Sequence, residues 1–111
     1  HQENAYIDFR IETAEVSEEI PPYVLSPLIE NALKHGLTSN ENPIVINLNL
    51  KDKKLNFKVI NSIAIQKKDK LGGIGLDNLK KRLEFHYPQK HQLKLVNQNN
   101  QFTAELEIDL K

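Results

Sequence analysis

Hydrophobic and polar residues alternate in five stretches of the chain, which is the pattern of a β-strand with one buried face. The alternation predicts strands at residues 5–11, 44–50, 55–59, 93–95 and 102–110. Short polar segments separate the second stretch from the third and the fourth from the fifth, so each of these pairs is expected to form a β-hairpin. All five strands are expected to bury one face.

A different period marks two other segments, in which hydrophobic residues recur about every 3.6 positions, as on one side of an α-helix. The first helix covers residues 24–33 and ends at Gly36, a residue type that often caps a helix. The second covers residues 76–87 and is stopped by Pro88.

Pro27 leaves two possible start positions for the first helix. Either the helix begins beside this proline with Ser26 as N-cap, or an earlier helix begins near Pro22 and kinks at Pro27. The amino-acid pattern alone does not choose between the two.

The elements follow one another in the order strand, helix, strand, strand, helix, strand, strand. Hairpins separated by helices predict an α+β domain, with both helices on the apolar face of one mixed, mostly antiparallel sheet. The other face of this two-layer α/β sandwich is expected to be wet. The whole chain, residues 1–111, is expected to be one domain, because roughly 100 to 150 residues build a single core.

The composition narrows the function classes. The 15 basic and 15 acidic residues give zero formal net charge, so no nucleic-acid-binding surface is expected. The absence of cysteine excludes disulfides and thiolate metal sites and fits a reducing compartment, so we expect a cytoplasmic location. No apolar run approaches the roughly 18 residues of a membrane span. The chain begins at His1, so we expect a fragment of a longer protein whose membrane anchor lies outside it.

Three polar residues, Asn31, Lys34 and His35, lie along one border of the apolar arc of the first helix. An amide oxygen can ligate magnesium, an ammonium group pairs with phosphate, and an imidazole can stack on a base. Together the three residues indicate a site for a magnesium nucleotide. Each alone also fits a structural role: a buried amide bonded to backbone, a solvated lysine, and a histidine favoured by the helix dipole.

Three glycines, Gly72, Gly73 and Gly75, precede the second helix. Glycine permits positive φ and close approach to the backbone, and the free N–H groups of a helix N-terminus attract phosphate. The loop could therefore hold a polyphosphate. The same glycines also fit an ordinary tight turn.

With these two clusters, the chain resembles the ATP-binding domain of LytS-type sensor histidine kinases, whose superfamily includes DNA gyrase and the heat-shock chaperone ATPases. The string IPPYVLSPLIENALKHGL is similar to the N box of that group. The string GGIGLDNLKKRLEFHYP is similar to its second glycine box, with the trailing Arg-Leu of the LytS type. The resemblance extends over residues 5–110 and implies the Bergerat-type ATP-binding fold.

The resemblance also implies roles for the matching residues. On the first helix, Asn31 is expected to ligate Mg²⁺, Lys34 to reach the phosphates of ATP, and His35 to pack against the adenine. Pro27 stands where the superfamily's ATPases carry a glutamate, and Glu30 is expected to face solvent. Transfer to a protein side chain is therefore expected rather than hydrolysis.

At the start of the second helix, Gly73 and Gly75 with the backbone of Leu76 are expected to form the phosphate-facing loop. The polar segment 62–71 would be the ATP lid. Its candidate phosphate contacts are Lys67, Lys68 and Lys70.

Asn61, in the string VINSI, stands where the superfamily usually has a carboxylate that accepts the adenine amino proton. Its amide oxygen can accept the same bond. A neutral bond contributes about 0.5 to 1.5 kcal/mol where a charged one contributes roughly 1.5 to 3. A loss on the order of tenfold in affinity is expected.

The resemblance implies a catalytic domain that binds Mg-ATP and donates the γ-phosphoryl to a histidine on a separate dimerisation region, and thence to a response regulator. No histidine of this chain matches a phosphoacceptor signature. The chain alone is therefore expected to be a monomer that does not phosphorylate itself, and the full-length protein a homodimer. Two other functions stay open: a degenerate docking or signalling platform, and an anti-sigma-factor type serine kinase, which the LytS-like spacing fits less well.

Overall fold

The computed structural model describes four stretches of the chain, residues 7–13, 22–35, 42–63 and 73–110. In chain order their elements are β1 (Ile7–Thr13), α1 (Pro22–His35), β2 (Ile44–Lys51), β3 (Lys54–Ser62), α2 (Gly73–His86), β4 (His91–Gln98) and β5 (Gln101–Asp109). The predicted order of strands and helices is confirmed.

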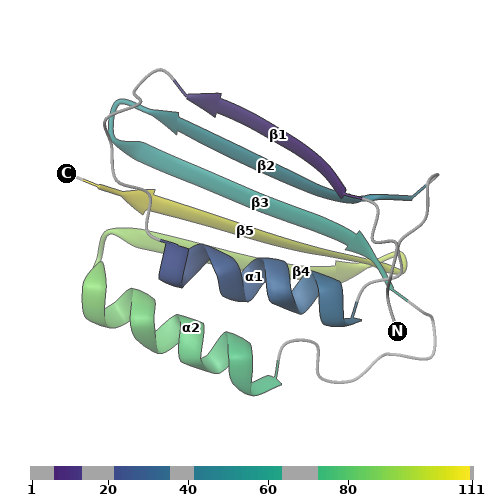
Figure 1. The fold of residues 1–111 in the computed structure, drawn as a ribbon. Coiled ribbons are helices and arrows are strands. Elements are labelled where there is room, and N and C mark those ends of the chain that lie inside the picture. The colour runs from purple at the N-terminus through teal and green to yellow at the C-terminus, as the bar shows by residue number, and fades with distance from the viewer. Residues whose placement is uncertain (1–6, 14–21, 36–41, 64–72, 111) are drawn as a thin grey trace.

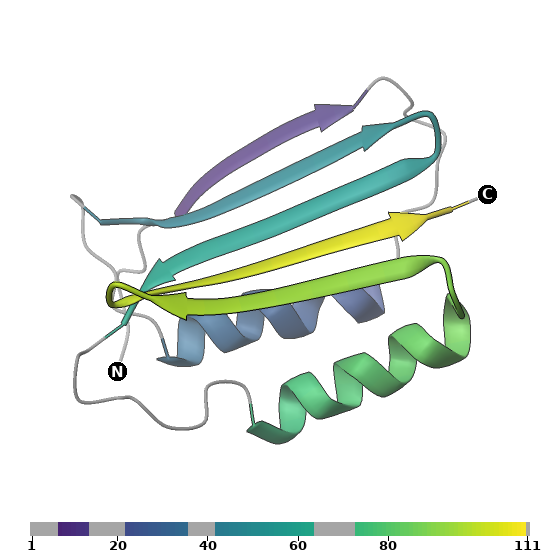
Figure 2. The same cartoon turned by 180° about the vertical axis from the view of Figure 1, so that it is seen from behind.

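The strands form one mixed sheet in the order β1-β2-β3-β5-β4. β1 runs parallel to β2, and the other neighbouring pairs are antiparallel. α1 and α2 lie side by side on one face of this sheet (Figures 1 and 2). The α+β class and the two-layer arrangement with a mixed, mostly antiparallel sheet are therefore confirmed.

Two tight turns build the predicted hairpins. Asp52 and Lys53 connect β2 to β3, and Asn99 and Asn100 connect β4 to β5, with φ between 54° and 62° at these residues. Two consecutive residues of positive φ are typical of type I′ turns, whose twist matches that of antiparallel strands. The main-chain N–H of Ile63 donates to the carbonyl of Asn100 at 3.0 Å, which ties the end of β3 to the second turn.

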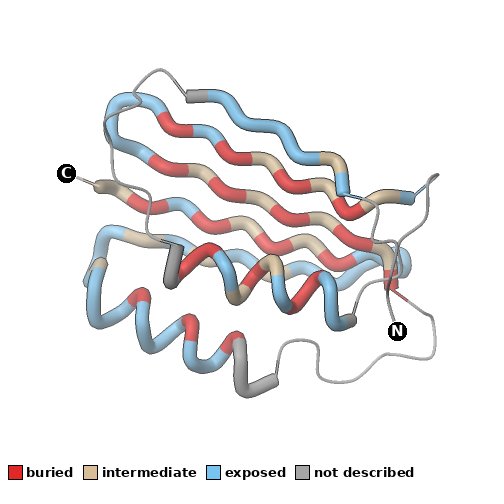
Figure 3. Tube along the Cα trace, viewed as in Figure 1, coloured by how far each residue is buried: buried red, intermediate tan, exposed pale blue. Residues whose placement is uncertain are grey.

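The helix-covered face of the sheet carries the core. Every second residue of β2, β3 and β5 is buried (Figure 3), and Leu28, Leu79 and Leu83 of the helices belong to the same buried cluster. Burial of a leucine side chain contributes roughly 1.5 to 3 kcal/mol. The opposite face is polar, and on it Asn56 Nδ2 donates to Glu105 Oε2 at 3.1 Å. The expectation of one wet face is confirmed.

β4 meets the prediction that all five strands bury one face only in part, because its Leu93 and Leu95 are half-buried. β1 departs from the prediction altogether. Its apolar residues Ile7, Phe9 and Ile11 are 44%, 53% and 57% exposed. The physical reason is the position of the helical layer, because α1 packs on β3 and α2 on β4. Neither described helix extends over β1 (Figures 1 and 2).

Pro27 lies inside α1, which begins at Pro22, so the earlier of the two predicted starts is the correct one. Proline has no N–H, and residue 27 therefore cannot donate to the carbonyl of Tyr23. Pro22 occupies the first helical position, where an N–H would lack an intrahelical partner anyway. Neither α1 nor α2 is long and apolar enough to cross a membrane.

Candidate functional site

The two segments that carry the sequence motifs meet at one end of the molecule. The C-terminal end of α1, the N-terminal end of α2 and the C-terminal end of β3 all lie at that end, and α1 packs against α2 (Figures 1 and 2). Asn31 and Lys34 lie toward the end of α1, Asn61 is next to last in β3, and Leu76 is in the first turn of α2. We call this region the motif end.

Asn61 is a buried polar side chain with one unsatisfied atom. It follows Phe57 and Val59 in the row of β3 that faces the helices, because alternate strand residues share a face, and it is only 2% exposed. Its Nδ2 donates to the main-chain carbonyl of Ser62 at 3.2 Å. Its Oδ1 is buried and accepts no hydrogen bond from the residues that the structure describes. Such an acceptor costs about 1 to 3 kcal/mol unless a donor reaches it.

Asn31 is the second buried polar residue at the motif end, at 9% exposure. It lies one turn after the buried Leu28, which places it at the border of the apolar face of α1. Its side chain makes no hydrogen bond to the part of the chain that the structure describes. The structural alternative of an amide bonded to backbone is therefore not observed among the described residues.

Lys34 lies one turn further along α1 than Asn31 and is exposed. A buried amide followed by an exposed ammonium on the same side of a helix suits a ligand that enters from solvent with its anionic part outward. Glu30 is also exposed, as expected. The predicted role of the His35 side chain lies outside the described residues, although residue 35 ends α1.

The N-terminus of α2 differs from the predicted loop. α2 begins at Gly73, so Gly73 and Gly75 are in the first helical turn, and the expectation of a glycine loop before the helix is wrong for both. The first four N–H groups of an α-helix have no intrahelical acceptor, so the turn that holds these glycines still presents donors suited to an anion. Leu76 is buried and belongs to the hydrophobic core cluster.

The remaining predicted contacts, Gly72 and the lid lysines Lys67, Lys68 and Lys70, lie outside the described residues. The described part of the chain contains no group of three or more histidine, cysteine, aspartate or glutamate residues that could hold a metal ion. Magnesium usually keeps several waters and binds through one or two protein ligands together with substrate phosphates. One amide, that of Asn31, is compatible with this mode.

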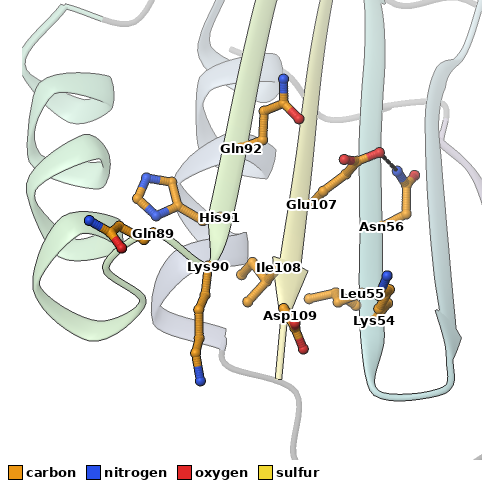
Figure 4. Close-up of a pocket in the computed structure, with 10 residues that line it drawn as sticks. All are labelled: Lys54, Leu55, Asn56, Gln89, Lys90, His91, Gln92, Glu107, Ile108 and Asp109. Atoms are coloured by element: carbon orange, nitrogen blue, oxygen red, sulfur yellow. Dashed lines mark hydrogen bonds between the residues drawn. The ribbon is translucent and has the colours of Figure 1, made fainter. Parts of the chain in front are cut away.

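A hollow of about 470 Å³ lies at the other end of the sheet, beside the turn between β2 and β3 (Figure 4). It is lined by Lys54, Leu55, Asn56, Gln89, Lys90, His91, Gln92, Glu107, Ile108 and Asp109. Several of its polar groups already have partners: Asn56 Nδ2 donates to Glu107 Oε2 at 3.3 Å, and His91 Nδ1 lies 2.8 Å from the carbonyl of Tyr87. None of the predicted site residues lines it. We call this region the hairpin end.

No protein-family model matches the sequence, and no curated protein matches it. Solved structures match its fold. The catalytic domain of histidine kinase ThkA in a nucleotide-free form is 22% identical, with a TM-score of 0.64 over 94% of this chain and 80% of that chain. Histidine kinase AdeS of Acinetobacter baumannii is 15% identical, with a TM-score of 0.56 over 96% of this chain and 56% of that one.

A third match is ThkA in complex with the response regulator protein TrrA. It is 23% identical, with a TM-score of 0.60. The match covers 95% of this chain and 34% of that chain. The chain thus spans about a third of that ThkA chain. The chain has the fold of histidine kinase catalytic domains.

Proposed function

We propose that the chain is the catalytic, ATP-binding domain of a sensor histidine kinase of the LytS type. It binds Mg-ATP and donates the γ-phosphoryl to a histidine on the dimerisation region of the full-length homodimer, in two-component signal transduction. The observation that carries the proposal is the unpartnered Oδ1 of Asn61, which is buried at the same end of the molecule as Asn31 and the N-terminus of α2.

The proposal assigns a role to each of the predicted site residues at the motif end. Asn61 Oδ1 accepts a hydrogen bond from the amino group of the adenine, which satisfies the orphaned acceptor. Asn31 ligates Mg²⁺, which when bound neutralises phosphate charge. Lys34 and the first N–H groups of α2 attract the phosphates. His35 is proposed to pack against the adenine.

Catalysis in this proposal is positioning and charge stabilisation. Pro27 offers no base to activate water, and Glu30 faces solvent, so the chain favours transfer to a protein acceptor over hydrolysis. The acceptor histidine is on the dimerisation region, and the next acceptor is an aspartate of a response regulator. The proposal places this domain in the cytoplasm, with the full-length protein anchored in the inner or plasma membrane.

The proposal is tested first by titrating the chain with a fluorescent ATP analogue in magnesium. Saturable binding that unlabelled ATP displaces is expected, and no binding at millimolar concentration overturns the proposal. The full-length protein is then incubated with ATP labelled at the γ-phosphate. Label that is lost in acid and kept in base is expected for phosphohistidine, whereas the reverse stability indicates a serine kinase.

A second candidate is a module that keeps the fold without catalysis and serves as a docking or signalling platform. Asn61, in place of the usual carboxylate, favours it, because a neutral acceptor binds the base less tightly. This candidate predicts that Lys34→Ala leaves partner binding intact. The kinase proposal predicts that the same change lowers phosphorylation in the full-length protein.

A further inference from the structure

β1 is an edge strand with two contrasting faces. Among the described elements it pairs only with β2, and it ends the strand order of the sheet. Ile7, Phe9 and Ile11 stand in register with Ile44, Ile46 and Leu48 of β2, so they lie on the helix-facing side, where they are largely exposed. A row of three exposed large apolar side chains on an unpaired edge is a surface that favours association.

The other face of β1 is charged. Arg10 Nη2 donates to Asp8 Oδ2 at 2.8 Å, and Glu12 follows two residues further on. Charges on an edge strand usually oppose pairing with another edge, because like charges then face each other. The order of these charges decides which strand can pair here.

The sequence of β1 is complementary to itself in one antiparallel register. When Phe9 stands opposite Phe9 of a second copy, Ile7 stands opposite Ile11, and Asp8 stands opposite Arg10 on both sides of the centre. Within residues 7–11, apolar residues then meet only apolar residues, and the Asp8 carboxylate of each copy meets the Arg10 guanidinium of the other.

The neighbouring registers are worse. A slip of two residues sets Asp8 against Asp8 in one direction, or Arg10 against Arg10 in the other. A slip of four residues restores an ion pair between Arg10 and Glu12 but sets Phe9 against Thr13. A slip by one residue turns the apolar row of one copy to the charged face of the other.

We propose that β1 pairs antiparallel with β1 of a second copy of this chain, in the register that centres on Phe9, and so joins two sheets into one. The pairing gives partners to the edge main-chain groups that have none among the described residues, and it sets the apolar rows of the two copies side by side, which removes part of their surface from water. It is separate from the proposed dimerisation region of the full-length protein and does not depend on nucleotide binding. It replaces the expectation that the isolated chain is a monomer.

The register is tested by disulfide trapping. The chain has no cysteine, so Phe9→Cys introduces a single thiol. Directly opposed residues of an antiparallel pair have Cα atoms about 4.5 to 5.5 Å apart, within the range that a disulfide spans. Phe9→Cys is expected to form a covalent dimer on mild oxidation. The matched control Ile11→Cys, which faces residue 7 in this register, is expected to form no disulfide-linked dimer, and equal trapping of both variants overturns the register.

The charge pairing is tested by sedimentation, because the side chains of β1 are exposed and their exchange is not expected to unfold the domain. The wild-type chain is expected to dimerise reversibly. Asp8→Arg and Arg10→Asp are each expected to weaken the dimer by about tenfold or more, and the double exchange to restore it within about threefold. A wild-type chain that stays monomeric at high micromolar concentration, or a double exchange that stays as weak as the single ones, overturns the proposal.

Discussion

The motif end and the hairpin end of the sheet use polar residues in opposite ways. At the hairpin end, polar groups line an open hollow, and Asn56 and His91 already have hydrogen-bonding partners. At the motif end, Asn31 and Asn61 are buried, and Asn61 Oδ1 has no hydrogen-bonding partner in the described part of the chain. If the proposed function holds, an unsatisfied buried acceptor marks the ligand site, whereas the larger open hollow does not.

The two ends of the sheet also differ in what their polar groups contribute to stability. An unpaired buried acceptor lowers the stability of the ligand-free protein by about 1 to 3 kcal/mol, and a ligand that supplies the donor recovers that free energy on binding. A partnered, solvated group such as Asn56 offers a ligand no such gain. Substitutions at the motif end should therefore separate stability from binding, and substitutions at the hairpin end should change neither by much.

The largest expected effect is that of Asn61→Asp. A carboxylate at this position, which is only 2% exposed, is largely removed from water, so the free energy of unfolding at pH 7 is expected to fall by about 3 kcal/mol. Affinity for Mg-ATP is expected to rise by about tenfold, because the bond to the adenine amino group becomes charge-assisted. Urea unfolding and calorimetric titration measure the two effects.

The matched control for this change is Asn97→Asp at an exposed position of β4, for which a change within about 0.5 kcal/mol is expected. Equal losses of stability in both variants would contradict the special burial of Asn61.

The next effect concerns the metal. Asn31→Ala is expected to weaken Mg-ATP binding at least about tenfold, or about 1.4 kcal/mol, because it removes the proposed ligand. The difference from wild type is expected to shrink when EDTA removes the magnesium. Calorimetric titration with and without the metal measures this dependence. Asn56→Ala at the hairpin end serves as the control and should bind as wild type does; an equal loss in both variants speaks against a site at the motif end.

A smaller effect with the opposite sign is expected for Asn61→Leu. Leucine is close to asparagine in size and removes the unsatisfied acceptor, but it also removes the bond from Nδ2 to the Ser62 carbonyl, so the ligand-free protein should gain at most about 1 kcal/mol in its free energy of unfolding. Binding of Mg-ATP should weaken about tenfold. Thermal unfolding with and without the nucleotide measures both. Asn56→Leu loses two side-chain bonds and should not gain stability. A loss of stability in Asn61→Leu would mean that Oδ1 is already satisfied.

The smallest effect is expected for Lys34→Ala. Lys34 is exposed, so its attraction to the phosphates is screened, and a loss of about threefold in affinity is expected, with a weaker dependence on salt. Lys54→Ala at the hairpin end should leave the affinity and its salt dependence unchanged. Titrations at low and high salt compare the two variants, and identical behaviour would remove Lys34 from the site.

Much of the fold could be predicted because hydrophobic periodicity reports directly on local structure. The alternation in β2, β3 and β5 marked their buried faces correctly. The same alternation in β1 did not, because period two shows that a strand has an apolar face but not whether another layer covers it. Coverage depends on where α1 and α2 pack, which is a property of the whole sheet.

The candidate site could be predicted in part. Motif resemblance picked out Asn31, Lys34 and Asn61, and the fold brings their elements to one end. Local patterns could not place Gly73 and Gly75 inside α2, because glycine fits both a loop and a first helical turn. The orphaned oxygen of Asn61 could not be foreseen either, since it depends on which donors the packed fold brings within reach. The roles of His35 and of the lid lysines stay predictions.

The proposed nucleotide site is tested most directly by mapping amide chemical shifts while Mg-ATP is added to the isotope-labelled chain. The two ends of the sheet are far enough apart along β3 to be told apart residue by residue. The largest shifts are expected at Asn31, Asn61 and Leu76, with little change at Lys54 and His91. Shifts that gather around Lys54 and His91, or none at millimolar nucleotide, would contradict the site.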